Sequence, residues 1–305
     1  SGMIGLALTE TLLEKGFKVI GTDSKPNDFV NSPNYSFVQA SIDDKSSITN
    51  ILNGSSIDAL VHLACSCDND FPPIITSAEE KKSSTVDKYL YKAAVDAGVG
   101  DIILLSTYQV YAPQKTREPI RETSDEKPTT AYGKMKYESE KAMAKVVTKS
   151  PSCKCVIARV SPVYTKTFTD NLKAKVFDPK EGCAFVYGYG DYGYSFCCVY
   201  NFVDFVCGIL NIAPGVNYMG VYNVCDTKPI AAKDILDVLR ECHAIGAVVQ
   251  RNLGSEGIKG LFNFGGGGKN DYRYNDISLA CSNISYDNTK AQRISAFRWK
   301  LSNTK

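Results

Sequence analysis

The sequence is poor in histidine, with only His62 and His243 among 305 residues. Because histidine is the commonest nitrogen ligand of metals in proteins, this scarcity argues against a histidine-rich metal site. Cys65 and Cys67 are two positions apart, which does not match the spacing of a metal-binding or redox cysteine pair. We therefore expect no metal site.

The sequence also lacks an excess of charge of either sign. It has 35 basic and 33 acidic residues, a net charge of +2, and the basic residues are scattered among acids. This pattern is not that of a nucleic-acid-binding or anionic-membrane-binding surface. No apolar run reaches the roughly 18 residues that a membrane span needs. We expect neither nucleic acid nor a membrane as a partner.

Two features of secreted proteins are missing as well. The first residues have no charged start and no cleavage site of a signal peptide. The 11 cysteines are an odd number, and most lie in apolar runs such as 153–157 and 196–199. Buried thiols behave as small hydrophobic groups, whereas disulfide frameworks are typical of short secreted chains. We therefore expect free thiols and a cytoplasmic protein.

What the first half of the chain has is an alternation of short apolar runs with helical patterns. The runs cover residues 19–22, 37–40, 59–64, 102–106 and 155–158, and helical patterns precede or separate them, the clearest over 131–147. Near-continuous apolar runs suit strands that are buried on both faces. The alternation predicts an α/β fold with a Rossmann-type, doubly wound parallel sheet.

The alternation ends near Pro162, and this predicts two domains. Residues 1–161 are expected to form a Rossmann dinucleotide-binding domain, which the strand and helix of 199–225 rejoin. Residues 162–198 and 226–305 are expected to form a smaller α+β domain for the substrate. No apolar strand precedes the first helix in this sequence, so we expect the complete protein to have one there.

A glycine turn opens the chain. Gly2-Met3-Ile4-Gly5 is followed by a helix, a strand and then Asp23, 18 residues after Gly5. Glycines let the backbone approach a pyrophosphate at a helix N-terminus, and an acid about 20 residues later accepts hydrogen bonds from a ribose. A carboxylate repels a 2′-phosphate, so NAD is favoured over NADP, although Lys25 lies close by. A plain glycine turn before an amphipathic helix is the alternative.

Tyr132 and Lys136 are four residues apart and share one face of the helix predicted over 131–147. A cation beside a phenol lowers the phenol pKa and helps it to exchange a proton near neutrality. The same spacing is common on ordinary solvated helices, so the pair indicates a catalytic site only together with other motifs in the sequence.

In that context the chain resembles the extended short-chain dehydrogenase/reductase family, which contains NAD-dependent nucleotide-sugar epimerases, dehydratases and reductases. Six segments match its motifs in order: residues 2–5, 22–23, 62–64, 105–111, 128–140 and 221–224. The resemblance implies that Tyr132 is the acid/base, that Lys136 holds the nicotinamide ribose, and that Thr107 hydrogen-bonds the reacting oxygen. Ser106 is the alternative hydroxyl, and His62 is expected to pack in its strand rather than to catalyse.

The resemblance also assigns binding residues. The cofactor contacts are Gly2, Met3, Ile4, Gly5, Asp23, Ser41, Ile42, Leu63, Ala64, Cys65, Tyr132, Lys136 and Val163. The substrate contacts are Ser66, Tyr108, Gln109 and Lys166.

The sequence departs from the family in three places. The dehydratases have Asp and Glu after the threonine, but here Tyr108 and Gln109 follow, and an amide cannot titrate. The usual asparagine is replaced at Pro162. The arginine that pairs with the diphosphate is replaced by Tyr194, so an anchor is lost unless Lys166, Lys173 or Lys175 supplies the charge.

These observations favour an NAD-dependent epimerase or reductase that acts on a sugar, with a nucleotide-linked sugar as the expected substrate. Two alternatives stay open: a cofactor-binding regulatory protein on the same fold, and a sugar-nucleotide dehydratase or decarboxylase. The resemblance further implies a homodimer formed through the helix of Tyr132 and its neighbour.

Overall fold

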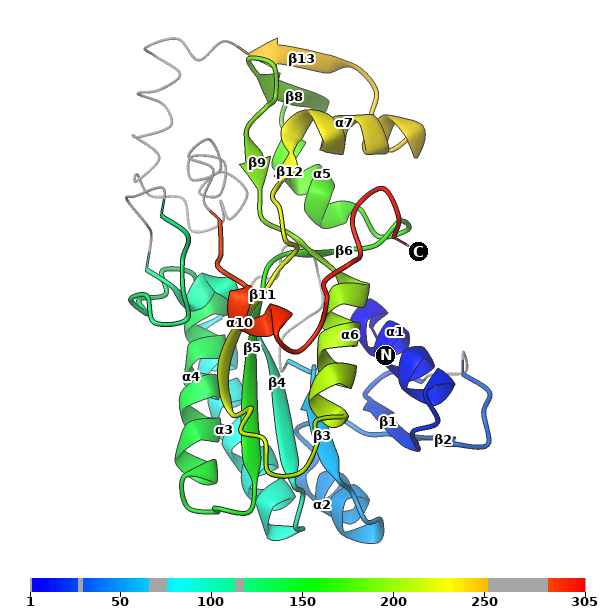
Figure 1. Ribbon diagram of the computed structural model, residues 1–305, viewed down its shortest axis with the longest axis vertical. Helices are drawn as coiled ribbons and strands as arrows, with labels where there is room; N and C mark the ends of the chain where they lie inside the picture. The colour runs from blue at the N-terminus through cyan, green and yellow to red at the C-terminus, as the bar shows by residue number, and fades with distance from the viewer. Residues whose placement is uncertain (1, 27–29, 66–75, 113–117, 252–284, 305) are drawn as a thin grey trace.

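The computed structural model describes residues 2–26, 30–65, 76–112, 118–251 and 285–304. Its centre is a parallel sheet of four strands in the order β11-β5-β4-β3, with helices on both faces (Figure 1). This arrangement confirms the α/β, Rossmann-type fold. The strands of this sheet are β3 (Ala59–His62), β4 (Asp101–Thr107), β5 (Lys154–Val160) and β11 (Gly220–Val224). The helices around it are α1 (Met3–Glu14), α2 (Lys45–Gly54), α3 (Ser77–Asp96), α4 (Ala131–Val147) and α6 (Val199–Leu210), with the short 3-10 helix η1 (Tyr108–Val110) after β4.

Strand β4 shows why the apolar runs of the sequence are continuous. Ile102 and Leu104 pack in a cluster with α3 and α4, whereas Ile103 and Leu105 pack on the opposite face with α1 and α6. All four side chains are buried. Because side chains alternate along a strand, only a strand covered on both faces needs apolar residues at every position.

Strands β1 (Val19–Asp23) and β2 (Tyr35–Gln39) form a separate parallel pair beside α1 (Figure 1). Among the described residues, β1 pairs only with β2 and β3 pairs only with β4, so each has an unpaired edge. Ile20 is 37% exposed, which is high for an apolar residue in a parallel strand.

The segment 199–225 lies with the first half of the chain. Strand β11 pairs with β5 in parallel register, and α6 packs against α1. This supports the division at residue 161 with a later return to the first domain, which we keep as a proposal. None of the helices in the described ranges is long and apolar enough to cross a membrane.

A smaller α+β region lies beyond the strand ends, in the upper part of Figure 1. Its strands are β6 (Val163–Tyr164), β7 (Phe177–Asp178), β8 (Cys183–Tyr187), β9 (Gly193–Tyr194), β10 (Cys197–Cys198), β12 (Ile230–Ala231) and β13 (Val248–Arg251). Its helices are α5 (Asp170–Val176) and α7 (Ala232–Glu241), and the short α10 (Thr289–Gln292) lies against β11. Tyr164, Leu172, Phe196 and Ile235 are fully buried in its separate apolar cluster.

The cysteines follow the expectation with one exception. Eight of those described are free, and five of them are buried as small apolar side chains. Cys65 is disulfide-bonded, so the expectation of free thiols is wrong for this residue. Cys65 follows a strand end and does not lie in an apolar run, so burial does not keep it from oxidation.

Candidate active site at the carboxyl ends of the parallel strands

The parallel strands of the central sheet bring two groups of predicted site residues to one edge: Thr107 ends β4, and residues 63–65 follow β3. Asp23 ends β1, in the separate parallel pair of β1 and β2. The start of α1 reaches the same edge, because a Cβ atom added to Gly5 would lie 3.8 Å from Leu63 Cδ1. Ligands of open α/β sheets bind at this edge, outside the carboxyl ends of the strands.

The opening glycine turn forms the N-terminus of α1. Gly2 is the N-cap residue, in an extended conformation, and the helix continues for 12 residues. Met3 and Ile4 are partly buried and pack with Leu63 against the main apolar cluster. The backbone N–H groups of the first turn thus lie beside the residues that follow β3. Such a helix start carries a partial positive charge that suits a phosphate.

Asp23 is ready to accept hydrogen bonds at the end of β1. Its Oδ1 accepts one from the backbone N–H of Lys25 at 2.9 Å. Burial acts to raise the pKa of this carboxyl, but the backbone hydrogen bond from Lys25 and the Lys25 charge act to lower it. Asp23 is therefore a carboxylate at neutral pH, as the predicted contact to a ribose requires.

The remaining predicted cofactor residues lie around this edge in different environments. Ser41 is exposed after β2, and its Oγ accepts from the backbone N–H of Asp43 at 3.3 Å. Ile42 and Val163 are partly buried, Ala64 is exposed, and Cys65 is partly buried with its Sγ 3.7 Å from Met135 Sδ. Ser66, predicted to contact the substrate, lies outside the described residues.

The two candidate hydroxyls at the end of β4 differ in what they contact. Ser106 is buried and its Oγ donates to the carboxylate of Glu140 on α4. Thr107 is buried too, but its Oγ1 accepts from the backbone N–H of Gln109 at 3.3 Å, as the N-cap of η1. The Ser106 hydroxyl is therefore bound to a buried carboxylate in the core, whereas the Thr107 hydroxyl lies at the strand end.

The start of α4 is fixed against the segment that follows Thr107. Thr130 is its N-cap and accepts from the backbone N–H of Gly133 at 3.0 Å. The same hydroxyl donates to Gln109 Oε1 at 2.6 Å. A side chain at Gly133 would clash with the carbonyl oxygen of Gln109. Glycine at this position therefore lets the first turn of α4, which carries Tyr132, contact the backbone after Thr107.

Tyr132 and Lys136 lie one turn apart on α4 but in different surroundings. Tyr132 is half-buried in the first turn, whereas Lys136 is only 3% exposed. A lysine is almost never fully buried without a specific role or partner. The solvated surface pair that the spacing alone allows is thus not what the structure contains.

The predicted substrate residues that the structure describes follow two strands, β4 and β6. Tyr108 is half-buried and its ring contacts that of Tyr286, with centroids 5.6 Å apart. Gln109 is half-buried and accepts from Thr130, while Lys166 is exposed after β6. Lys166 is therefore not brought into a structured contact here.

Lys173 and Lys175, the other two candidates for the charge of the missing arginine, both lie near aromatic rings. Lys173 Nζ lies 4.6 Å above the ring of Phe177. Lys175 is buried, with Nζ 5.8 Å from the ring centroid of Tyr194, whose hydroxyl donates to the Lys175 carbonyl at 3.1 Å. Of the three candidates, Lys175 is the cation placed beside the residue that replaces the arginine.

The sequence reasoning missed the buried network beneath the site. Arg159 donates to Glu140 at 3.1 and 2.7 Å and also contacts Glu126. Burial acts against the charge of Arg159, but Glu140 more than compensates and holds its pKa above the usual value. Glu140 and Arg159 matched family motifs, but no local pattern indicates that they pair. Thr130 could have been found from its place before a helix.

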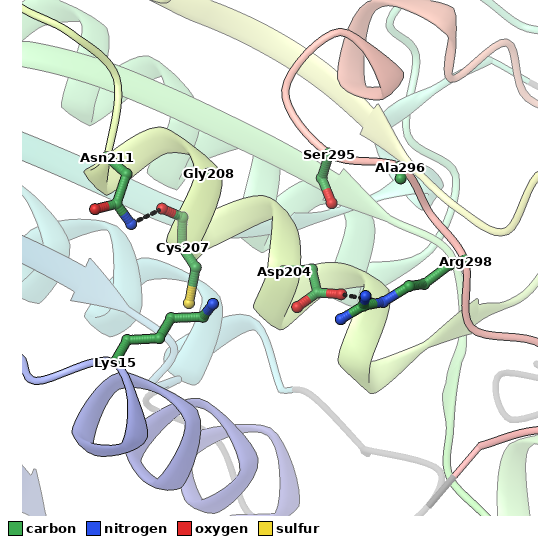
Figure 2. A pocket seen from close by; sticks show the side chains of 8 residues that line it. All are labelled: Lys15, Asp204, Cys207, Gly208, Asn211, Ser295, Ala296 and Arg298. Atoms are coloured by element: carbon green, nitrogen blue, oxygen red, sulfur yellow. Dashed lines mark hydrogen bonds and ion pairs between the residues drawn. The ribbon is translucent and has the colours of Figure 1, made fainter.

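The described residues contain no group of three or more His, Cys, Asp or Glu side chains that could hold a metal ion. Figure 2 shows a pocket of about 250 Å³ between α6 and the segment around Ser295, with the ion pair of Asp204 and Arg298 across it. Lys15, at the far end of α1 from Gly2, lines it, so this pocket is not the predicted cofactor site.

Comparisons with known proteins agree with this geometry. The model of the NAD-dependent epimerase/dehydratase family matches residues 1–225. No curated protein sequence matches the chain. Among solved structures, dTDP-glucose 4,6-dehydratase from Streptomyces venezuelae with NAD bound is similar at a TM-score of 0.70 and 20% identity, covering 98% of this chain and 90% of that one.

Two epimerases are similar to the same degree. UDP-glucose 4-epimerase from Thermotoga maritima with UDP-glucose has a TM-score of 0.69 and 18% identity, covering 96% of this chain and 89% of that one. UDP-glucuronic acid 4-epimerase from Bacillus cereus with NAD also has a TM-score of 0.69 and 18% identity, and the match covers 99% of this chain and 93% of that one. At these identities the likeness establishes the fold.

Proposed function

Because the chain belongs to the NAD-dependent epimerase/dehydratase family, we propose that it binds NAD and epimerises or reduces a nucleotide-linked sugar. The solved structures that resemble it hold NAD, UDP-glucose or UDP-glucuronic acid. The observation that carries the proposal for this chain is the contact of the α4 start with the segment after Thr107. This contact joins the first turn of α4, which carries Tyr132 and precedes the buried Lys136 by one turn, to Gln109, two residues after Thr107.

In the proposed reaction, Tyr132, Thr107 and Lys136 each have one role. When a sugar carbinol is oxidised, its hydroxyl proton passes to Tyr132 Oη, and Thr107 Oγ1 hydrogen-bonds the same oxygen. Lys136 binds the ribose next to the nicotinamide and supplies a positive charge beside the phenol. NAD, when bound, accepts and returns the hydride. In the reverse direction Tyr132 gives the proton back.

Asp23 supports NAD rather than NADP. The carboxylate ends β1 and is charged at neutral pH. It therefore accepts hydrogen bonds from a free ribose hydroxyl and repels a 2′-phosphate. The backbone N–H of Lys25 donates to the Asp23 carboxylate, and the Lys25 side chain is exposed beside it.

Gln109 argues against a dehydratase. It stands where the family's dehydratases have an acid, and its side-chain oxygen accepts from Thr130. An amide held in this way cannot pass the proton that leaves with water. Epimerisation and reduction need only Tyr132, Lys136, Thr107 and the cofactor. A purely regulatory role would not require the hydroxyl, the phenol and the buried lysine together.

Calorimetric titration of the full-length protein with NAD, NADP and a panel of UDP-, dTDP-, GDP- and CDP-sugars tests the proposal. We expect NAD and one sugar nucleotide to bind, with NADP weaker. Turnover then separates the two reactions, because a reductase consumes reduced cofactor and an epimerase returns it. NAD binding without any sugar nucleotide would instead favour a regulatory protein, and a product lighter by water would favour the dehydratase.

We also propose a homodimer through α3 and α4. These helices pack against each other on one side of the sheet (Figure 1). Their outward positions are dominated by lysines at matching intervals: Lys81, Lys88 and Lys92 on α3, and Lys134, Lys141 and Lys145 on α4. A two-fold contact through this face would place like charges opposite each other.

A further inference from the structure

A buried chain of polar side chains links β3, α3 and α4 directly beneath the candidate site. His62 Nδ1 and the hydroxyl of Tyr91 are 2.8 Å apart, and that hydroxyl lies 2.8 Å from Ser139 Oγ. On the other side of the ring, His62 Nε2 lies 3.7 Å from Asp87 Oδ1. All four residues are 3% exposed or less. The chain therefore crosses three elements without reaching solvent.

The direction of each hydrogen bond follows from the chemistry of the groups. A carboxylate only accepts, so the ring proton of neutral His62 belongs on Nε2, which faces Asp87. Nδ1 then accepts from the Tyr91 hydroxyl, and the Tyr91 oxygen accepts from Ser139. In the described residues, His62 Nε2 and Asp87 Oδ1 have no closer hydrogen-bond partner. A buried polar atom without a hydrogen-bond partner costs free energy.

His62 and Ser139, at the two ends of this row of hydrogen-bonded side chains, both lie next to residues of the candidate site. His62 directly precedes residues 63–65, which are predicted to contact the cofactor. Ser139 lies three residues after Lys136, and its neighbour on the same helix face, Met135, contacts Cys65 at 3.7 Å. Lys136 is thus bracketed along α4 by the two residues that connect this helix to the strand end. Its charge is close enough to act on the His62 ring.

We propose that His62 is a positioning residue, which acts through Tyr91 and Ser139 to hold Lys136 in place against the cofactor-binding segment 63–65. The inference rests on the proposed function, because it concerns how Lys136 and residues 63–65 are held in position to bind NAD. Ion pairs at the surface of α3 and α4 cannot do this, since they are exposed and do not reach β3. The burial of His62 keeps its ring neutral beside the Lys136 charge.

Tyr91→Phe tests the inference, because it removes both hydrogen bonds and keeps the ring. Tyr89→Phe is the matched control on the same helix. Its hydroxyl also makes two hydrogen bonds, to Thr49 at 2.6 Å and to the Lys45 carbonyl at 3.1 Å, but these connect α3 to α2. NAD binding, by calorimetry, and steady-state kinetics would be measured for each variant at the same number of degrees below its melting temperature.

We expect Tyr91→Phe to weaken NAD binding about tenfold and to lower kcat by up to about 100-fold, as a small misplacement of a catalytic group does. Tyr89→Phe should leave both within about twofold, the range of a surface change. Ser139→Ala, which loses a single bond, should give a smaller effect of the same kind. Equal effects of Tyr91→Phe and Tyr89→Phe would overturn the inference and show that the network only adds stability.

Replacement of His62 separates positioning from packing. His62→Asn places an amide oxygen near Nδ1 and should restore most NAD affinity, whereas His62→Leu should not. Equal affinities of these two variants would also overturn the inference. Absence of NAD binding by the wild-type protein would be a different result: it would refute the proposed function, and the positioning role with it.

Discussion

At the scale of single residues, burial separates the members of the candidate catalytic set. Lys136 and Thr107 are almost completely buried, and Tyr132 is half-buried at the mouth of the site. A group that exchanges a proton with a substrate has to be reachable, whereas a cation that only holds a ribose and a phenol works best where little water screens it. The exposures fit the division of roles that we propose.

This division predicts different losses for two variants. Tyr132→Phe should lower kcat by about 100-fold or more, the usual share of a general acid/base, and leave the Kd for NAD nearly unchanged. Lys136→Met should lower kcat and also raise the Kd for NAD, because it removes the ribose contact. Calorimetry and kinetics on both variants check this. Undiminished turnover by Tyr132→Phe would contradict the mechanism.

His62 predicts a pH dependence of stability. Burial lowers the pKa of His62 to about 4, with Asp87 opposing and Lys136 adding to the effect. The folded state therefore binds this proton less readily than the unfolded state, in which the pKa is about 6.5. The stability contributed by neutral His62 is complete above pH 6.5. It falls by about 3 kcal/mol as the pH drops to about 4.

Denaturant unfolding of the wild type and His62→Asn across this pH range measures the contribution. The variant is a necessary reference, because Asp226 acts in the opposite sense: burial raises the pKa of its carboxyl to about 6. Stability from Asp226 therefore increases as the pH falls through 6. The difference between wild type and variant should shrink towards pH 4. A constant difference would mean that His62 does not titrate as inferred.

At the scale of elements, the N-terminus of α4 determines the geometry of the site. The helix is positioned by its cap, Thr130, and by the absence of a side chain at Gly133. Both residues contact Gln109, which follows Thr107 closely in the chain, and both determine where Tyr132 lies. A small shift of this helix would move the phenol away from Thr107.

Gly133→Ala is expected to harm the protein despite the better helix propensity of alanine. The added methyl group clashes with the carbonyl oxygen of Gln109, and such overpacking costs about 1–3 kcal/mol. We expect a lower melting temperature and a kcat reduced more than tenfold, on the scale of a displaced catalytic group. Gly54→Ala in α2 is the control, because nothing lies within 4 Å of its added Cβ.

The control variant should be neutral or more stable by up to about 1 kcal/mol. Thermal unfolding and kinetics of the two alanine variants test the contrast. If Gly133→Ala were as active and stable as Gly54→Ala, the start of α4 would have room to move, and its close contact with Gln109 would not determine the site.

At the scale of the whole molecule, the surface of α3 and α4 bears on assembly. The proposed dimer would bring six lysines of each copy near those of the other, with Asp96 and Glu138 as partial compensation. Repulsion between such charges is screened by salt. Surface charge therefore decides under which conditions this dimer forms.

We expect the dimer to strengthen when the salt concentration rises from about 0.05 to 0.5 M, where the screening length becomes much shorter. Lys88→Glu and Lys145→Glu should strengthen it at low salt. Sedimentation velocity at several salt concentrations measures this. Dissociation of a dimer on addition of salt would indicate a different interface, held by opposite charges.

The alternation of apolar runs and helical patterns was sufficient to predict the parallel sheet and the extent of α4 from Ala131 to Val147. Both depend on periodicity within a few turns or strands, which the local sequence carries. The placement of Thr107 and of residues 63–65 at one edge also follows, because the strands of a parallel sheet end at the same side.

The contacts between distant residues were decided only by the tertiary structure. Tyr91 meets Ser139 across 48 positions, and Arg159 pairs with Glu140 across 19, without any local pattern that links them. The exposed Lys166 and the buried Lys175 look alike in sequence, since a charge does not reveal its own burial. Periodicity determines which face of an element is apolar, but the packing of elements determines which polar groups become buried together.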